Sequence, residues 1–115
     1  MRLLISQVEF EQLIGLQESE TPVPNFTIVY FTAGWCSACR RLDLPAIEAA
    51  TTGANWLKCD VDSNNYTAGY CGIRSIPTFL AVVDKKVVGK LSSSNHQDVI
   101  DWVNGLMEKA VNKQI

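Results

Sequence analysis

The feature that most constrains this chain is a continuous run of β-branched and aromatic residues, Phe26–Thr32. A run without alternating polar residues is typical of a strand that is buried on both faces of a parallel sheet. Parallel neighbours need long crossover connections, and these are usually helices. The run therefore predicts an α/β fold in which helices cover a central sheet.

Further strands are expected on either side of this run. A short apolar segment occupies residues 1–5, and residues 56–62 form a second mostly buried strand. Residues 78–83 and 86–91 also have strand composition and are separated by only two residues. Because so short a connection joins antiparallel neighbours, these last two strands should form a hairpin at the edge of the sheet.

Four segments carry helix signals. Ser6 and Glu9 have the spacing of a capping box, in which each residue's side chain binds the other's backbone N–H, ahead of a helix ending near residue 17. A helix over residues 39–50 should be kinked by Pro45. The other two are a short helical turn that begins at Asn64 or Asn65 and a last helix that begins at Ser94 or Asn95.

The resulting order, β-α-β-α-β-α-β-β-α, predicts a mixed sheet flanked by helices in one domain over residues 1–115. The 10 basic and 12 acidic residues give a net charge of -2, which argues against a nucleic-acid partner. No apolar run approaches the roughly 18 residues of a membrane span, and residues 1–5 are too short for a signal sequence. We expect a cytoplasmic monomer without a membrane partner.

A C-x-x-C, Cys36 and Cys39, directly follows the buried strand and opens the expected helix. Free N–H groups and the dipole at a helix N-terminus stabilise a negative sulfur, which lowers the thiol pKa from about 8.5. The three-residue spacing brings the two sulfurs within bonding reach. The pattern predicts Cys36 as an attacking thiolate and Cys39 as the thiol that resolves the mixed disulfide.

The same spacing occurs in metal sites, so alternatives stay open. A structural zinc site usually needs four ligands, and the remaining candidates, Cys59, Cys71 and His96, form no second C-x-x-C or C-x-x-H. We expect no metal in the monomer and no redox role for Cys59 or Cys71. An iron–sulfur cluster between the cysteine pairs of two chains remains an alternative, as does a non-catalytic binding module.

A second motif narrows the choice: Ile76-Pro77-Thr78 opens the strand at residue 78. The proline either punctuates the strand or forms a cis peptide bond that turns the preceding backbone toward the cysteines. Three segments in this order resemble the thioredoxin family over nearly the whole chain: Trp35-Cys36-Ser37-Ala38-Cys39, Lys58-Cys59-Asp60-Val61-Asp62 and Ile76-Pro77-Thr78.

The resemblance implies a thioredoxin fold and a thiol–disulfide oxidoreductase of the protein-disulfide reductase type. It implies no cofactor beyond the redox-active Cys36–Cys39 disulfide, with Cys36 exposed and Cys39 buried. Partners would be disulfide-containing proteins and a thioredoxin reductase or small thiol. The Ile76 backbone would pair with an extended substrate by β-strand addition. The residues implied in substrate binding are Trp35, Ser37, Ala38, Ile76 and Pro77.

The dipeptide between the cysteines departs from the family, which usually has Gly-Pro where this chain has Ser37-Ala38. Ala38 keeps an N–H that proline lacks, and we expect this donor near the Cys36 sulfur. A donor there favours the thiolate and hence the reduced form. The reduction potential should therefore be less negative than that of an ordinary thioredoxin.

A second departure concerns the proton of Cys39. Tyr30 stands where the family usually has a buried aspartate that accepts this proton, and Lys58 matches the lysine that partners the aspartate. A phenol with a reference pKa of about 10 is a poor base. We expect Tyr30 to fill space, so that resolution is slower or water or another group takes the proton, and we keep Tyr30 and Lys58 as proton-transfer candidates.

Three arginines, Arg40, Arg41 and Arg74, lie near these motifs in the sequence. One interpretation is that they cluster at the site and favour the thiolate or acidic partners. The other is that they are ordinary solvated charges.

Overall fold

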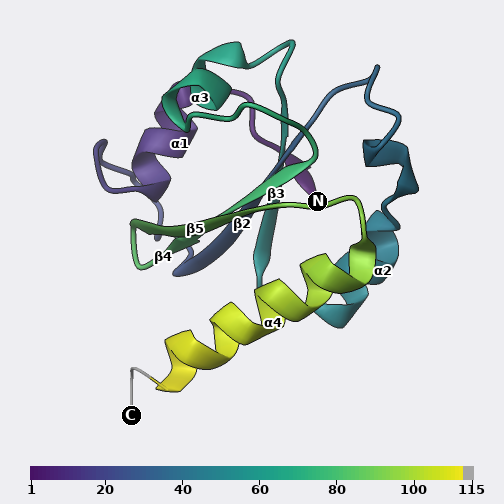
Figure 1. Cartoon of the computed structure of the whole chain (residues 1–115). Helices are drawn as coiled ribbons and strands as arrows, with labels where there is room; N and C mark the ends of the chain where they lie inside the picture. Colours follow the sequence, from purple (N-terminus) through teal and green to yellow (C-terminus); the bar gives the residue numbers. More distant parts are fainter. Residues whose placement is uncertain (113–115) are drawn as a thin grey trace.

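The structure, a computed structural model, describes residues 1–112. It follows the predicted order of elements, apart from an additional 3₁₀ turn (Figure 1). The elements are β1 (Arg2–Leu3), α1 (Gln7–Leu13), β2 (Phe26–Thr32), the 3₁₀ turn (Cys39–Arg41), α2 (Leu44–Ala50), β3 (Asn55–Asp60), α3 (Asn65–Tyr70), β4 (Thr78–Val83), β5 (Lys86–Ser92) and α4 (His96–Asn112).

The five strands form one mixed sheet in the order β1-β3-β2-β4-β5. β3 is parallel to both β1 and β2, whereas β4 is antiparallel to β2 and to β5. The mixed sheet is confirmed, and one of the two neighbours of β2 is antiparallel, so its continuous apolar run does not require parallel neighbours on both sides. β2 is buried along its whole length because helices cover both faces of the sheet, whatever the direction of its neighbours.

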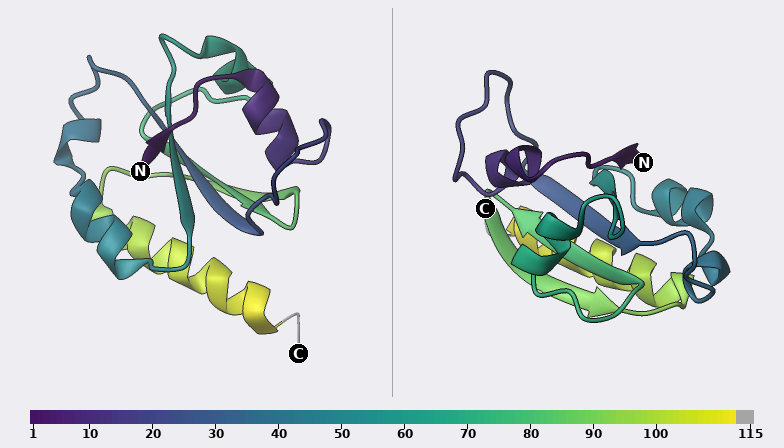
Figure 2. Two further views of the ribbon diagram at one scale, coloured as in Figure 1. Left: turned by 180° about the vertical axis from the view of Figure 1, so that it is seen from behind. Right: turned by 90° about the horizontal axis from the view of Figure 1, so that it is seen from above.

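The two faces of the sheet carry separate cores. Figure 2 shows α2 and α4 on one face and α1 and α3 on the other. Since side chains alternate along a strand, Ile28 and Tyr30 of β2 join the α2/α4 core, whereas Val29 and Phe31 join the α1/α3 core. The apolar residues of β2 therefore contribute alternately to the cores on the two faces of the sheet.

The start of α1 differs in part from the predicted capping box. Ser6 Oγ accepts a hydrogen bond from the Glu9 N–H at 3.2 Å, as expected. The Glu9 carboxylate instead accepts from Nη1 of Arg2, at 2.9 Å to each oxygen. α1 ends at Leu13 rather than near residue 17, because the chain turns at Gly15 with a φ of 78°.

The predicted helix over residues 39–50 is two separate elements. The 3₁₀ turn ends where Leu42 adopts an extended conformation, and Asp43 Oδ1 then caps α2 by accepting from the Ala46 N–H at 3.1 Å. Pro45 lies in the first turn of α2, where a missing N–H costs no helical hydrogen bond. The proline therefore marks a helix start, and the prediction of a kink is wrong.

The other boundaries agree closely with the sequence patterns. β3 ends at Asp60 rather than at residue 62. Asn64 and Asn95 cap the N-termini of α3 and α4 through their side-chain oxygens, as predicted. Asp84 and Lys85 both have positive φ, which gives the β4–β5 hairpin its tight turn. None of the helices within residues 1–112 is long and apolar enough to cross a membrane.

Replacing the cap of α2 tests its separate start. Asp43→Ala should lower the free energy of unfolding by about 1 kcal/mol, because the Ala46 N–H loses its acceptor. Asp43→Asn should retain wild-type stability, since asparagine caps equally well. Urea denaturation of the three proteins measures the difference. A helix continuous from residue 39 would be insensitive to Asp43→Ala.

Candidate redox site

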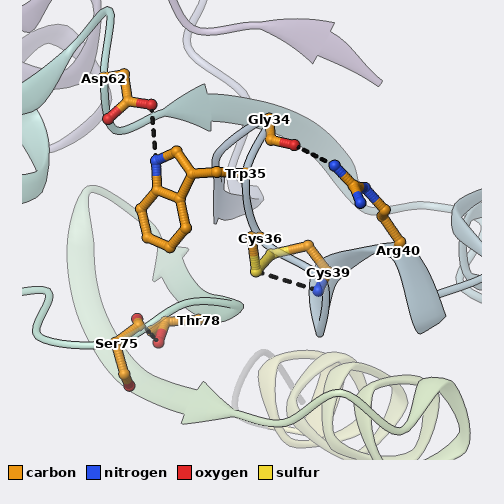
Figure 3. The surroundings of a disulfide bond; sticks show 8 residues. All are labelled: Gly34, Trp35, Cys36, Cys39, Arg40, Asp62, Ser75 and Thr78. Atoms are coloured by element: carbon orange, nitrogen blue, oxygen red, sulfur yellow. Dashed lines mark hydrogen bonds between the residues drawn. A yellow bond between two sulfur atoms is a disulfide. The ribbon is translucent and has the colours of Figure 1, made fainter.

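Cys36 and Cys39 are joined as a disulfide, with their Cα atoms 5.3 Å apart (Figure 3). They lie in the loop that follows the carboxyl end of β2, and Cys39 opens the 3₁₀ turn. The sequence placed Cys36 at the N-terminus of a long helix, but α2 begins only at Leu44. The prediction that a helix dipole activates Cys36 is therefore wrong, because the helix starts too late in the chain.

One backbone N–H, rather than a helix N-terminus, donates to the sulfur of Cys36. The N–H of Cys39 donates to Sγ of Cys36 at 3.1 Å. We expected a donor at Ala38 as well, but no hydrogen bond from its N–H is found in the part of the chain that the structure describes. A hydrogen bond to sulfur stabilises a thiolate relative to a thiol, so the local backbone favours a negative charge on Cys36.

Neither cysteine is exposed in the disulfide form. Cys36 is 4% and Cys39 is 7% exposed, and both belong to the α2/α4 core. The expectation of an exposed Cys36 is therefore wrong for this oxidised state. Ala38 and Ile76, both half-buried, pack against the same core. Ser37, between the cysteines, is exposed to solvent.

Trp35 borders the disulfide and is 66% exposed. Its Nε1 donates to Oδ2 of Asp62 at 2.9 Å (Figure 3). Thr32 and Asp60 are register partners at the ends of the parallel strands β2 and β3, so the residues that follow them meet at one edge of the sheet. Asp62 was not predicted from the sequence as a residue of the site. Its place after the end of a strand parallel to β2 is a signal that could have identified it.

Arg40 holds the loop from its other side. Its Nη2 donates to the carbonyl oxygen of Gly34 at 2.7 Å (Figure 3). The side chain thus links the residue after Cys39 to the residue before Trp35. A guanidinium offers donors in a fixed planar fork, which suits it to holding a carbonyl oxygen. Arg40 therefore belongs to the site, where it ties the loop together.

The Ile76-Pro77 peptide bond is cis, which confirms the second interpretation of the proline. Thr78, the next residue, donates from Oγ1 to the carbonyl oxygen of Ser75 at 2.7 Å and so ties the loop to the start of β4. Ile76 is half-buried and packs against both cores. Pro77 is buried.

A pocket of about 390 Å³ lies between this loop and Trp35. It brings together two of the residues predicted for substrate binding, Trp35 and Ile76, whereas Ser37, Ala38 and Pro77 do not line it. A chain that docks here would contact mostly apolar side chains. The lining residues are Trp35, Val61, Ala68, Ile73, Arg74, Ser75 and Ile76.

Tyr30 is fully buried in the same core as the cysteines. Its ring stacks on Phe79 with centroids 5.0 Å apart. Burial raises the pKa of the Tyr30 phenol, against a smaller lowering by a hydrogen bond with Thr32. The phenol is therefore neutral at physiological pH and serves to fill space. Lys58 is its register partner on β3 and is half-buried.

The two other cysteines are free thiols in the α1/α3 core. Burial, with smaller contributions from Cys71 and Asp60, raises the pKa of Cys59 to about 12. Burial also raises the pKa of Cys71 to about 11, although nearby Lys90 lowers it. Both thiols are therefore neutral at physiological pH. Among the described residues, no group of three or more His, Cys, Asp or Glu side chains could hold a metal ion.

Comparison with known proteins follows the same features. The thioredoxin family model matches residues 4–105. Thioredoxin-3, mitochondrial, of Saccharomyces cerevisiae is 30% identical over 94 residues, which cover 80% of this chain and 68% of that protein. The TPR repeat-containing thioredoxin TDX of Arabidopsis thaliana is 39% identical over 66 residues, 56% of this chain, and the match spans only 17% of that longer protein.

A solved structure agrees with the fold. The thioredoxin of Fasciola hepatica superimposes with a TM-score of 0.76 at 26% identity, covering 90% of this chain and 97% of that one. The family match contains β2, the cysteine pair and the Ile76-Pro77 loop alike. The chain therefore belongs to the thioredoxin family, and it is a thiol–disulfide oxidoreductase.

Proposed function

We propose that this protein reduces disulfides in other proteins, with Cys36 as the attacking thiolate and Cys39 as the resolving thiol. The Cys36 thiolate attacks one sulfur of the substrate disulfide, which forms a mixed disulfide and releases one substrate thiolate. Cys39 then loses its proton and attacks Cys36 Sγ, which forms the Cys36–Cys39 bond and releases the second thiolate. Two electrons pass from the protein to the substrate.

The observation that carries this assignment is the asymmetry of the pair. The Cys39 N–H donates to Cys36 Sγ, so the local backbone favours negative charge on Cys36. Cys39 and Tyr30 belong to the same core, and burial raises the pKa of the Tyr30 phenol. Because Tyr30 is a poor base, we expect the Cys39 proton to leave to water.

Substrate docks at the pocket beside the disulfide. Trp35 and Ile76 line this pocket from two different loops and offer apolar contact. Pro77 fixes the path of the loop, and the Ile76 backbone pairs with an extended substrate by strand addition. Ser37 and Ala38, between the cysteines, contact the substrate from the other side of the disulfide. Main-chain pairing accepts many sequences, which suits a reductase of varied proteins.

The partners follow from this cycle. The protein acts on disulfide-containing proteins, and a thioredoxin reductase or a small thiol reduces the Cys36–Cys39 disulfide afterwards. We place the protein in the cytoplasm as a monomer, where the exchange maintains cell redox homeostasis and carries electrons. The two free thiols, Cys59 and Cys71, support this placement, since thiols stay reduced in the cytoplasm.

Insulin reduction tests the proposal. The wild-type protein should reduce insulin with dithiothreitol as electron donor, and Cys36→Ser should abolish the reaction because no nucleophile remains. Cys39→Ser should accumulate the mixed disulfide, which non-reducing mass spectrometry detects. Cys71→Ser, which leaves the redox pair intact, should retain wild-type activity. If the wild-type protein and both active-site variants were equally inert, the protein would not be a reductase. The absorbance spectrum of freshly purified protein would then test for an iron–sulfur cluster.

The dipeptide sets the reduction potential. We expect a potential less negative than about -270 mV, and a more negative value in Ala38→Pro. Proline removes the Ala38 N–H, which makes no hydrogen bond in the described residues of the disulfide form and can donate to the Cys36 thiolate in the reduced protein. Ala38 has a φ of -64°, which proline also adopts. Ala38→Gly retains the N–H and serves as the control. Equilibration with glutathione measures all three proteins, and a wild-type potential at or below about -270 mV would contradict the prediction.

Alkylation rates report the two kinds of thiol. In the reduced protein at pH 7, iodoacetamide should modify Cys36 first, since its sulfur has a backbone donor. The rate at Cys71 should rise about tenfold per pH unit toward its pKa of about 11, because the thiolate fraction rises in that proportion. Peptide mass spectrometry between pH 7 and pH 10 measures both. Equal rates at Cys36 and Cys71 at pH 7 would rule out selective activation of Cys36.

A further inference from the structure

A second pocket lies against the same loop as the docking pocket. It has a volume of about 450 Å³. The two pockets share Ile73, Arg74 and Ser75, so they adjoin along this stretch of the loop. A chain that lies along the docking pocket can therefore extend into the second one. The lining residues of the second pocket are Gly72, Ile73, Arg74, Ser75, Thr78, Lys90 and Ser92.

This second pocket is positively charged. Arg74 and Lys90 line it, and no acidic residue does. Neither cation forms an ion pair within residues 1–112. Lys90 donates one N–H from Nζ to the carbonyl oxygen of Cys71 at 3.3 Å, which leaves two of its three N–H donors for a ligand. In a chain with a net charge of -2, this is a local reversal of charge.

The hydroxyl groups of the pocket are already committed. Thr78 donates its only hydroxyl proton to the carbonyl oxygen of Ser75. In the 2.7 Å pair between Thr78 Oγ1 and Ser92 Oγ, Ser92 must then be the donor. Neither hydroxyl has a second proton to offer. An anion in this pocket is therefore held by the two cations, and the hydroxyls serve to link β4 to β5.

We propose that Arg74 and Lys90 bind the carboxylate of an acidic side chain close to the target disulfide of a protein substrate. The inference rests on the proposed reductase function and names its preferred substrates. An extended chain rises about 3.3 Å per residue, so four positions on either side of the target cysteine span about 13 Å each way, and these are the positions to test. An arginine fork matches the geometry of a carboxylate, and a lysine adds a mobile charge.

Disulfide peptides that differ in one residue test the preference. A single Glu or Gln is placed in turn at each of the four positions on either side of the target cysteine, and the second-order rate of reduction is measured. With wild-type protein, Glu should be preferred over Gln by about two- to fivefold for at least one position. The preference should fall with added salt, because mobile ions screen charges at a surface.

Charge-removing variants assign the preference to the pocket. The double variant Arg74→Gln/Lys90→Gln should reduce Glu and Gln peptides at equal rates, so that the Glu/Gln rate ratio falls to one. Because Arg74 also lines the docking pocket, this ratio is the readout, and not the rate with either peptide alone. Lys86→Gln, a lysine at the other end of β5, should retain the preference. Circular dichroism and thermal melting check that each variant is folded.

The outcomes separate this inference from the proposed function. If wild-type protein reduces Gln and Glu peptides equally well, the carboxylate subsite is wrong although the reductase function holds. A preference for Glu that persists in the double variant overturns the assignment to Arg74 and Lys90. If no peptide and no insulin is reduced, the proposed function fails and this inference fails with it.

Discussion

β2 occupies the centre of the sheet, and all seven of its residues are buried. Because side chains alternate along the strand, one set needs a layer of helices on one face and the other set needs a layer on the opposite face. The chain meets this demand with α2 and α4 on one side and with α1 and α3 on the other (Figure 2). The loop after β2 then turns toward the α2/α4 side, where Cys36 and Cys39 join the core. The redox pair is thus held by the same packing that holds the fold.

Features that depend on residues close together in the chain could be predicted from the sequence. The run of β2, the hairpin and the asparagine caps of α3 and α4 depend on neighbours in the chain, and the structure confirms them. The prediction of a kink at Pro45 is wrong, because this proline lies two residues after the capping Asp43. A proline in the first turn is compatible with a helix, whereas one in the interior of a helix disrupts it. Trp35 binds Asp62, which lies 27 residues later in the chain, and Arg40 binds the carbonyl oxygen of Gly34, six residues earlier. No periodicity in the sequence records such contacts.

The site separates two requirements that a dithiol reductase combines. The first is a thiolate at Cys36. The Cys39 N–H favours it by donating to the Cys36 sulfur, and this needs no particular side chain. The second is a base for Cys39, for which this chain has Tyr30 in place of a carboxylate. A buried carboxylate carries a desolvation cost, whereas a phenyl ring stacked on Phe79 contributes about 0.5–1.5 kcal/mol beyond its burial. The substitution therefore favours stability of the core at the expense of proton transfer from Cys39.

The charges around the docking pocket give it a direction. Asp62 does not line the pocket, but it binds the indole of Trp35 through one carboxylate oxygen, so its negative charge lies beside a lining side chain. Arg74 lines both pockets, and Lys90 lines the second one. In the proposed docking mode, strand addition at Ile76 supplies affinity through the main chain, but main-chain hydrogen bonds hold many sequences equally well. A charge gradient along the pocket distinguishes the acidic end of a substrate from its basic end, and complementary charge contributes more to orientation and encounter rate than to affinity. The fold thus combines a docking edge that tolerates many sequences with a polarity that orients them.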